Sequence, residues 1–581
     1  MSPLLDICVE RNVAVPMRDG VVLRADVFRP EPEGRYPVLL TRTPYGKSVA
    51  NLAYGWLQPI RPASEGYVVI VQDVRGRFES QGTFNPFHQE LNDGFDTVEW
   101  AARQPWSNGR VGMYGLSYFG ATQWLAAAAQ PPNLQAIFPA LTASDYYDGW
   151  TYQGGAFELG FNLTWVGALL ALSDAPRSAL SPEQTQQLLA GLYKVVFDHW
   201  PALHHQPLRD LPAFAHDVVA PYYKQWLDHP TRDDFWAPIT IEDAHPRIHV
   251  PAYNLGGWFD LFIRGTLRNY TGMRTNGATE VARSGQKLIV GPWSHGATLT
   301  AITGQTVFGP AAQLLLEDLH MTWFDHWLRD SDNGVDREPP VRVFAMGTNA
   351  WNTFSDWPPA ESRPTSYYFH SNGGAATARG DGVLSTDPPG DERSDNFVYD
   401  PLNPCPTVGG ALFPFPLDVP PGQFDQARVE ARPDVLCYTS APLDRDTEVT
   451  GAVEVRLWAA STARDTDFTA KLVDVLPDGT PLNLIDGILR GRYHEGFDKI
   501  ALLDPGTPVE LHIDLAGVSN VFQRGHRIRV EISSSNFPRF DRNTNTGGLI
   551  ATDTANIVAM NTVLHDRRHP SQVILPVIHR A

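Results

Sequence analysis

One serine, set between glycines at the junction of two differently patterned segments, constrains the fold of this chain more than any other feature. Ser117 lies in the sequence Gly-Leu-Ser-Tyr-Phe-Gly at 115–120. Residues 110–114 favour a strand, and residues 121–129, which end in four alanines, favour a helix. The serine is therefore expected on a sharp strand-to-helix turn.

A strand-to-helix turn of this kind is typical of the nucleophile elbow of α/β-hydrolases. A serine hydroxyl attacks well only when a base takes its proton and its Oγ stands clear of the backbone. The turn exposes the Oγ, and small neighbours allow the backbones to approach. Here the second glycine is Gly120, so Phe119 stands where the general motif has glycine. We interpret Ser117 as a nucleophile, although a G-x-S match is also compatible with an ordinary turn serine.

Bulk properties limit the class of protein. A length of 581 residues predicts two to four domains, and the formal net charge of −19 disfavours nucleic acid and anionic membranes as partners. No window is apolar enough to span a membrane. Three cysteines are too few for a disulfide framework, and the N-terminus shows no signal-peptide pattern. We expect a cytoplasmic protein.

The hydropathy pattern changes twice along the chain. Strand and helix signals alternate over 1–145 and again over 245–350, which predicts a parallel sheet in an α/β-hydrolase catalytic domain. Residues 146–244 are rich in aromatics and helix formers and predict a helical lid insertion over the active site. Residues 351–581 carry short alternating strands between Gly, Pro, Asp and Asn clusters, which favours a β-sandwich or jelly roll.

The partners of the serine are expected in loops that follow strands, in the order serine, acid, histidine. Asp260 ends Gly-Gly-Trp-Phe-Asp at 256–260, and His295 ends Gly-Pro-Trp-Ser-His at 291–295. We predict that His295 is the general base and that Asp260 orients it. A surface turn aspartate and one loop histidine among 18 are the alternatives.

A tetrahedral intermediate needs hydrogen-bond donors for its oxyanion. One is predicted to be the backbone N–H of Tyr118, the residue after the nucleophile. The loop after strand 36–41 contains Tyr45, whose phenol could be the second donor; by composition alone it is equally compatible with packing. No metal-ligand, phosphate-loop or dinucleotide spacing is present, so no metal and no cofactor are expected.

Several long motifs occur in one order along the chain. They are Arg-Thr-Pro-Tyr at 42–45, Gln-Asp-Val-Arg-Gly at 72–76, Gly-Leu-Ser-Tyr-Phe-Gly at 115–120, Gly-Trp-Phe-Asp at 257–260 and Gly-Pro-Trp-Ser-His at 291–295. In these motifs the chain resembles the X-Pro dipeptidyl-peptidase family of serine hydrolases. The resemblance implies a hydrolase domain, a helical lid and a C-terminal jelly roll. It also implies the triad Ser117, Asp260 and His295, and it supports Tyr45 as an oxyanion donor.

Within this family the chain is most similar to an esterase whose acyl pocket accepts an aromatic acyl group. That likeness implies an acyl pocket at positions whose alternative interpretation is ordinary core packing: Trp150, Trp165, Phe262, Leu412 and Phe413. The lid matches poorly between about 155 and 240, so the preferred ester stays open.

We therefore predict a serine carboxylesterase that acts through an acyl-enzyme on small-molecule esters with bulky or aromatic acyl groups. The alternatives are an X-Pro dipeptidyl aminopeptidase, an α-amino-acid ester hydrolase or a β-lactam acylase. The first two bind a free α-ammonium, for which Asp145, Asp148 and Glu158 are candidate ligands. A carbohydrate-binding or inactive binding protein is disfavoured by the predicted triad. Long β-segments near the C-terminus leave a homodimer possible.

Overall fold

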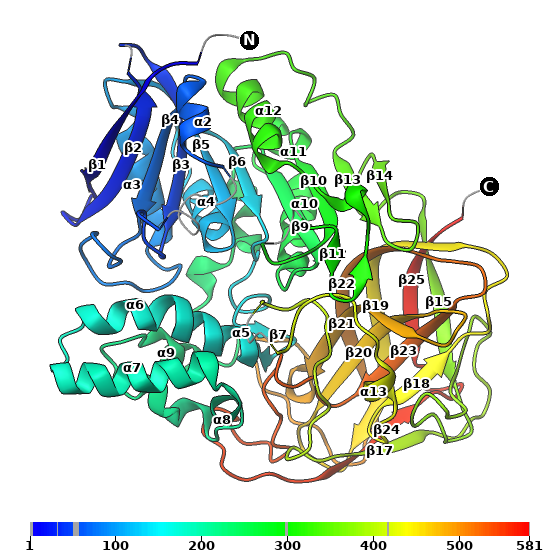
Figure 1. The fold of residues 1–581 in the computed structure, drawn as a ribbon. Helices are drawn as coiled ribbons and strands as arrows, with labels where there is room; N and C mark the ends of the chain where they lie inside the picture. Colours follow the sequence, from blue (N-terminus) through cyan, green and yellow to red (C-terminus); the bar gives the residue numbers. More distant parts are fainter. Residues whose placement is uncertain (1–3, 32, 50–56, 297–299, 415–417, 580–581) are drawn as a thin grey trace.

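The computed structural model describes residues 4–31, 33–49, 57–296, 300–414 and 418–579. Figure 1 shows three parts: a sheet flanked by helices, a layer of helices below it, and a sheet-rich C-terminal part beside both. The first part contains strands that pair in one ten-stranded sheet, here in spatial order: β1 (Ile7–Pro16), β2 (Val22–Pro30), β4 (Val68–Asp73), β3 (Tyr36–Thr43), β5 (Ser107–Leu116), β6 (Leu134–Ala140), β9 (Tyr253–Phe259), β10 (Lys287–Ser294), β13 (Val341–Ala345) and β14 (Ala350–Phe354).

The strands from β4 to β13 run parallel, and antiparallel strands β1, β2 and β14 extend the sheet at its two edges. Helices α3 (Glu90–Ala102) and α4 (Tyr118–Ala128) pack in one apolar cluster, while α2 (Ile60–Ser64) and α12 (Leu316–Arg329) pack in another on the opposite face. Further elements are α10 (Ile263–Asn276), α11 (Glu280–Ser284), β11 (Ile302–Thr303), β12 (Thr306–Val307) and a 3-10 turn at Pro310–Ala312. The predicted α/β-hydrolase-like domain is confirmed.

Local sequence explains where the elements begin. Strand β4 is buried at every position, as a β-branched run covered on both faces should be. Strand β9 starts only at Tyr253, because a 3-10 helix ends at Arg247 and Pro251 lacks the N–H that a ladder needs. Helix α12 starts at Leu316, after the 3-10 turn at Pro310–Ala312.

Between β6 and β9 the chain is mostly helical. A hairpin of two strands with two residues each, β7 (Tyr152–Gln153) and β8 (Ala156–Phe157), comes first. The helices are α5 (Leu159–Thr164), a π-helix (Trp165–Ala171), α6 (Leu172–Asp174), α7 (Pro182–Phe197), α8 (Trp200–Leu203) and α9 (Tyr222–Asp228), with 3-10 turns at Ala175–Arg177, Leu208–Asp210, Pro212–Phe214, Ala237–Ile239 and Glu242–Arg247. Helix α7 begins at a capping box of Ser181 and Gln184, with proline at the first helical position.

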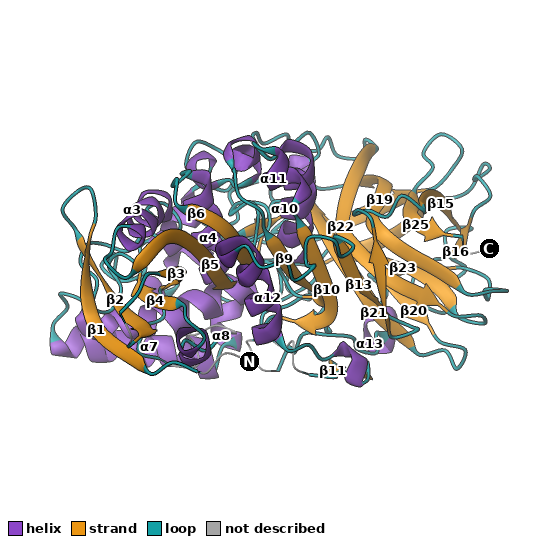
Figure 2. Ribbon diagram, turned by 90° about the horizontal axis from the view of Figure 1, so that it is seen from above, coloured by secondary structure: helices purple, strands orange, loops and turns teal. Residues whose placement is uncertain are grey.

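The C-terminal part is rich in sheet (Figure 2). Its strands are β15 (Ser362–His370), β16 (Val383–Ser385), β17 (Asp395–Tyr399), β18 (Leu436–Thr439), β19 (Thr447–Ser461), β20 (Asp467–Val475), β21 (Pro481–Arg490), β22 (Val509–Phe522), β23 (Arg527–Ser533), β24 (Ala559–Leu564) and β25 (Gln572–Ile578), with the short helices α13 (Ala427–Glu430) and Gly491–Tyr493. Apart from one parallel bridge between β16 and β18, the pairs are antiparallel. Strands β19 and β22 are longer than the short strands that the sequence pattern predicted.

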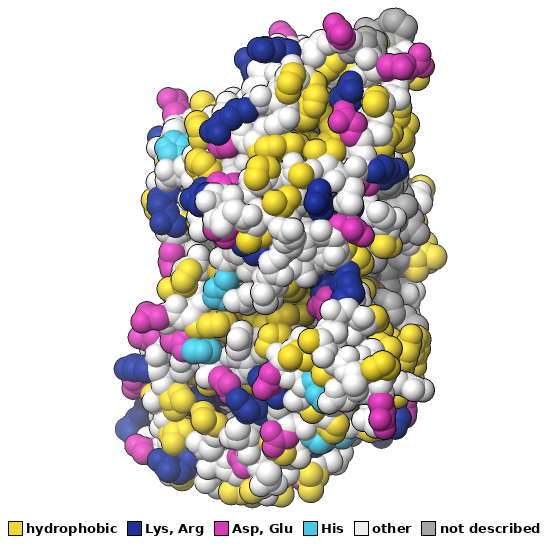
Figure 3. All heavy atoms as spheres, turned by 90° about the vertical axis from the view of Figure 1, so that its left-hand side faces the viewer, with side chains coloured by type: hydrophobic (Ala, Val, Ile, Leu, Met, Phe, Trp, Pro, Cys, Tyr) yellow, Lys and Arg dark blue, Asp and Glu magenta, His cyan; other side chains and the backbone are white. Residues whose placement is uncertain are grey.

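One apolar core joins the first and third parts. Trp258 and Val343 of the ten-stranded sheet share a buried cluster with Val453 and Leu511 of the C-terminal strands. None of the helices among the described residues is both long and apolar enough to cross a membrane. Figure 3 shows one face of the molecule, on which acidic and basic side chains are interspersed.

Candidate active site

The predicted elbow is present. Strand β5 ends at Leu116, α4 begins at Tyr118, and Ser117 between them has φ 59° and ψ −125°. Its backbone N–H donates to the carbonyl of Ala140 on the neighbouring strand at 2.8 Å. A left-handed φ is costly for a residue with a side chain, and it is typical of a serine held out from such a turn.

Steric contacts explain why both of these elbow positions are glycine. Gly115 has φ 129°, and a Cβ there would lie 2.5 Å from the Cβ of Phe119. A Cβ on Gly120 would lie 2.9 Å from the Cβ of Thr142, directly after β6. The requirement for glycine thus falls at 120, where the helix meets the neighbouring strand, and position 119 accepts phenylalanine.

The predicted acid and base are hydrogen-bonded. Asp260 follows β9, His295 follows β10, and the His295 Nδ1 lies 2.7 Å from the Asp260 Oδ1. Because β5, β9 and β10 are parallel strands of one sheet, all three residues lie at the same sheet edge. Asp260 is fully buried; burial raises its pKa, and the adjacent His295 ring opposes that rise.

A buried network holds the residue after the serine. The Tyr118 hydroxyl donates to Glu90 at 3.0 Å and accepts from the backbone N–H of Phe87 at 3.0 Å. Arg42 pairs with Glu90 at 2.6 Å, and both side chains are inaccessible to solvent. The backbone at Tyr118, the predicted oxyanion donor, is therefore fixed through its own side chain. Sequence reasoning missed Arg42 and Glu90, although the Arg-Thr-Pro-Tyr motif contains the arginine.

Tyr45 lies against the nucleophile. Burial raises the pKa of its phenol to about 12, and hydrogen bonds with Trp165 and Ser117 partly oppose this. The phenol therefore carries its proton at neutral pH and can donate it. The loop of Tyr45 is held on both sides: the Pro44 carbonyl accepts from Arg77 at 2.7 Å, and the Lys47 N–H donates to Asp73 at 2.6 Å.

Sequence reasoning gave no role to Asp73 or Arg77. The signal that could have found them is the motif at 72–76, which contains Asp73 and ends next to Arg77.

The predicted acyl-pocket residues lie in one aromatic cluster. Trp150 stacks on Phe262 with ring centroids 4.2 Å apart, and Trp165 lies 5.1 Å from Trp150. The His295 ring contacts Phe262 at 5.4 Å and Phe413 at 5.5 Å.

One member of the cluster was missed. The ring of Phe161 lies within 5.6 Å of four predicted pocket residues: Trp150, Trp165, Phe262 and Phe413. Leu412 lines a small cavity together with Phe413, Phe161 and Glu158. In the sequence, a phenylalanine inside a helix looks the same whether it lines a pocket or packs in the core, so Phe161 could not be singled out.

The three candidate carboxylates each face an arginine. Asp145 pairs with Arg232 at 2.9 Å, and Asp148 pairs with Arg268 at 3.0 Å. Glu158 lies 3.6 Å from Arg539. Burial raises the pKa of Glu158 to about 7 and that of Asp145 to about 6.

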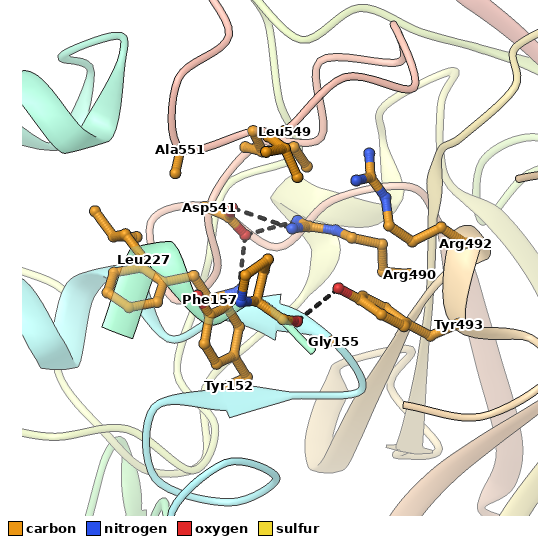
Figure 4. Close-up of a pocket in the computed structure, with 12 residues that line it drawn as sticks. Tyr152, Gly155, Phe157, Leu227, Arg490, Arg492, Tyr493, Asp541, Leu549 and Ala551 are labelled. Carbon is orange, nitrogen blue, oxygen red and sulfur yellow. Dashed lines mark hydrogen bonds and ion pairs between the residues drawn. The ribbon is translucent and has the colours of Figure 1, made fainter. Parts of the chain in front are cut away.

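A separate pocket lies where the β7–β8 hairpin meets the C-terminal part (Figure 4). Arg490 in its wall donates to both Asp467 and Asp541, and Asp541 also accepts from the backbone N–H of Phe157 at 2.9 Å. The Tyr493 hydroxyl donates to the Pro230 carbonyl at 2.6 Å. The charged groups pair within the C-terminal part, and the hydrogen bonds to Phe157 and Pro230 join that part to the helical part. Within the described ranges, no group of three or more His, Cys, Asp or Glu side chains is placed to hold a metal ion.

An α/β-hydrolase-like sheet with a strained serine elbow and an Asp–His pair at the same edge defines a serine hydrolase. The model of the X-Pro dipeptidyl-peptidase (S15 family) matches residues 19–297, and that of the X-Pro dipeptidyl-peptidase C-terminal non-catalytic domain matches residues 333–574. The chain belongs to the X-Pro dipeptidyl-peptidase (S15) family.

Its relatives include a cocaine esterase from Rhodococcus sp. (strain MB1 Bresler), which is 38% identical over 98% of this chain and 99% of that protein. An aminopeptidase from a marine sediment Thaumarchaeota archaeon has a similar structure, with TM-score 0.82 and 25% identity over 100% of this chain and 97% of that one. An α-amino acid ester hydrolase has TM-score 0.79 and 26% identity over 99% and 97% of the two chains.

Proposed function

We propose that this chain hydrolyses carboxylic esters, with Ser117 as nucleophile, His295 as general base and Asp260 as the residue that orients the imidazole. The Ser117 Oγ attacks the ester carbonyl carbon while the His295 Nε2 takes its proton. Asp260 keeps the Nδ1 proton in place and stabilises the imidazolium through the 2.7 Å contact. The Tyr45 phenol and the Tyr118 N–H donate to the oxyanion as it forms.

The tetrahedral intermediate then collapses. The bond to the alkoxy oxygen breaks, and His295 gives its proton to the leaving alcohol, which leaves an acyl group on the Ser117 Oγ. A water molecule, deprotonated by His295, attacks the acyl carbon; the bond to the Ser117 Oγ then breaks, His295 returns its proton to that oxygen, and the carboxylic acid is released. Every proton thus passes through one imidazole.

The substrate class we propose is esters with a bulky or aromatic acyl group. The observation that carries this proposal is that aromatic side chains from separate parts of the chain, Phe262 and Phe413, both contact the His295 ring. An acyl group on Ser117 next to these rings would be surrounded by apolar surface, and rings of this kind favour flat apolar groups. The printed name of the Rhodococcus relative, a cocaine esterase, agrees with this substrate class.

The remaining architectural predictions are also part of this proposal. We propose that residues 146–244 are a lid, because Trp150 and Phe161 contact the Phe262 ring and Trp165 donates to Tyr45. We also propose that the sheet of 351–581 is a jelly roll. The catalytic domain would then comprise 1–145 and 245–350. A small-molecule ester is the proposed partner; a homodimer, cytoplasmic location and the absence of nucleic-acid and membrane partners stay predictions.

Hydrolysis of α-amino-acid esters or peptides, or β-lactam acylase activity, is the second candidate. The names of the two structural neighbours favour the first two. Recognition of an α-ammonium needs available carboxylates, and Asp145 and Asp148 already pair with arginines. A bound ammonium would have to displace a guanidinium. The pairing of both carboxylates with arginines therefore favours ester substrates that have no α-ammonium group.

A substrate panel tests the choice. We expect kcat/KM for phenyl benzoate and for phenyl phenylacetate to exceed that for the phenyl ester of phenylglycine by at least tenfold; phenylglycine differs from phenylacetate only by its α-ammonium. Hydrolysis of Ala-Pro-p-nitroanilide should be slower still. A preference for the phenylglycine ester or for the anilide would overturn the proposed substrate class and favour the second candidate.

A further inference from the structure

Trp165 contacts the proposed oxyanion donor rather than only the acyl pocket. Its indole Nε1 donates to the Tyr45 hydroxyl oxygen at 3.0 Å, and the residue is buried. An indole N–H can only donate, whereas a phenol oxygen accepts with its lone pairs and donates with one proton. The contact therefore occupies an acceptor site of Tyr45 and leaves the phenol proton for another acceptor.

The backbone around Trp165 is fixed relative to the loop of Tyr45. Trp165 begins the π-helix that ends at Ala171, and π-helical turns are frequent at functional sites. Directly after it, Ser173 accepts from Arg77 at 2.6 Å and Asp174 forms an ion pair with the same guanidinium. Arg77 also donates to the carbonyl of Pro44, the residue before Tyr45, at 2.7 Å.

One buried arginine thus ties the helical segment that carries Trp165 to the loop that carries Tyr45. Arg77 has no solvent exposure, so its charge relies on these partners, and losing them would be costly. Two contacts, one through Trp165 and one through Arg77, keep the segment and the loop in one arrangement.

We propose that Trp165 is a positioning residue of the oxyanion hole: by donating to the Tyr45 oxygen, it directs the phenol proton toward Ser117 and the oxyanion that forms there. This inference rests on the proposed role of Tyr45 as oxyanion donor. It means that the helical segment contributes to the chemical step as well as to the shape of the pocket.

The electrostatic surroundings of Tyr45 agree with this role. The hydrogen bond from Trp165 and the positive charge of Arg77 both lower the pKa of the phenol, against the larger rise caused by burial. A donor whose oxygen already accepts a hydrogen bond is polarised and donates more strongly.

Trp165→Phe tests the proposal, because it keeps an aromatic ring and removes the N–H. The matched control is Trp226→Phe: Trp226 stacks on Trp165 at 6.0 Å, and its Nε1 has no hydrogen-bond partner within the part of the chain that the structure describes. We expect kcat of Trp165→Phe to fall about tenfold, as for a lost hydrogen bond of about 1.4 kcal/mol, equally for phenyl acetate and phenyl benzoate. Trp226→Phe should stay within about twofold of wild type. A loss confined to phenyl benzoate would overturn the proposal, because a pocket residue affects only bulky acyl groups.

A double-mutant cycle supplies the second readout. Tyr45→Phe alone should lower kcat by about 10²- to 10³-fold, and adding Trp165→Phe should lower it no further. If the two losses multiply, Trp165 does not act through Tyr45 and the proposal fails. If Tyr45→Phe keeps the wild-type kcat, Tyr45 is not an oxyanion donor and its proposed role is wrong. Should Trp165→Phe fold poorly by circular dichroism, Arg77→Met in the same cycle tests whether the helical segment acts through Tyr45, because Arg77 forms the second contact between the two.

Discussion

The proposed triad and the proposed acyl pocket of this hydrolase are built in different ways. Ser117, Asp260 and His295 follow parallel strands of one sheet, so hydrogen-bonded backbone sets their spacing. The aromatic cluster draws Trp150 from the helical segment, Phe262 from the first part and Phe413 from the C-terminal part. The spacing of the proposed triad therefore depends on one sheet, whereas the proposed acyl pocket depends on how three parts pack. Relatives that share the chemistry can thus differ in substrate.

The largest effect on turnover should come from a change in the proposed triad. Replacing the nucleophile in Ser117→Ala should lower kcat by about 10⁴- to 10⁶-fold, by the same factor for every ester, because all of them pass through the same oxygen. Steady-state hydrolysis of phenyl acetate and phenyl benzoate measures this loss. Ser144→Ala, at a buried serine outside the elbow, is the control. If Ser117→Ala retained wild-type turnover of either ester, an acyl-enzyme on this residue would be wrong.

A smaller and selective effect should come from the pocket. Phe413→Ala should lower the ratio of kcat/KM for phenyl benzoate to that for phenyl acetate by about 10- to 100-fold, since a ring contact is lost only to the larger acyl group. Leu402→Ala, at a C-terminal leucine that is 68% exposed, is the control. An unchanged ratio would show that the cluster around Phe413 is packing and does not select the acyl group.

The last expected effect is on stability rather than on rate, at Glu158 beside the aromatic cluster. Glu158 has a pKa of about 7 in the fold against an ordinary value of 4.5, so between these values the folded state binds the proton more tightly than the unfolded state does. Its contribution to the free energy of unfolding therefore falls as pH rises from 5 to 8. Relative to wild type, Glu158→Gln should gain roughly 2 to 3 kcal/mol over that range in urea denaturation.

The exposed Glu183 provides a matched control for this measurement, because Glu183→Gln makes the same chemical change in the same segment. A difference between Glu158→Gln and wild type that stays constant from pH 5 to pH 8 would show that Glu158 is ionised throughout in the fold.

Local sequence features pointed to the proposed triad, whereas contacts between distant segments left no signal in the sequence. The elbow, Asp260 and His295 are marked by glycines and by strand ends, which are local features that can be recognised in the sequence before the fold is known. The Arg77 contact with Ser173 and the approach of Trp165 to Tyr45 join residues far apart in the chain, and no local pattern encodes them. Phe161 looks like any helical phenylalanine until the fold places it against Phe413.

The position of Phe413 has a consequence for the order in which this protein matures during synthesis. Ribosomes deliver the N-terminal segments first, and domains generally fold as units as they emerge. The proposed nucleophile, acid and base all precede residue 300, whereas Phe413, whose ring contacts His295, belongs to the part that is synthesised last. A nascent chain would hold a complete set of reactive groups before it holds the surface that chooses their substrate.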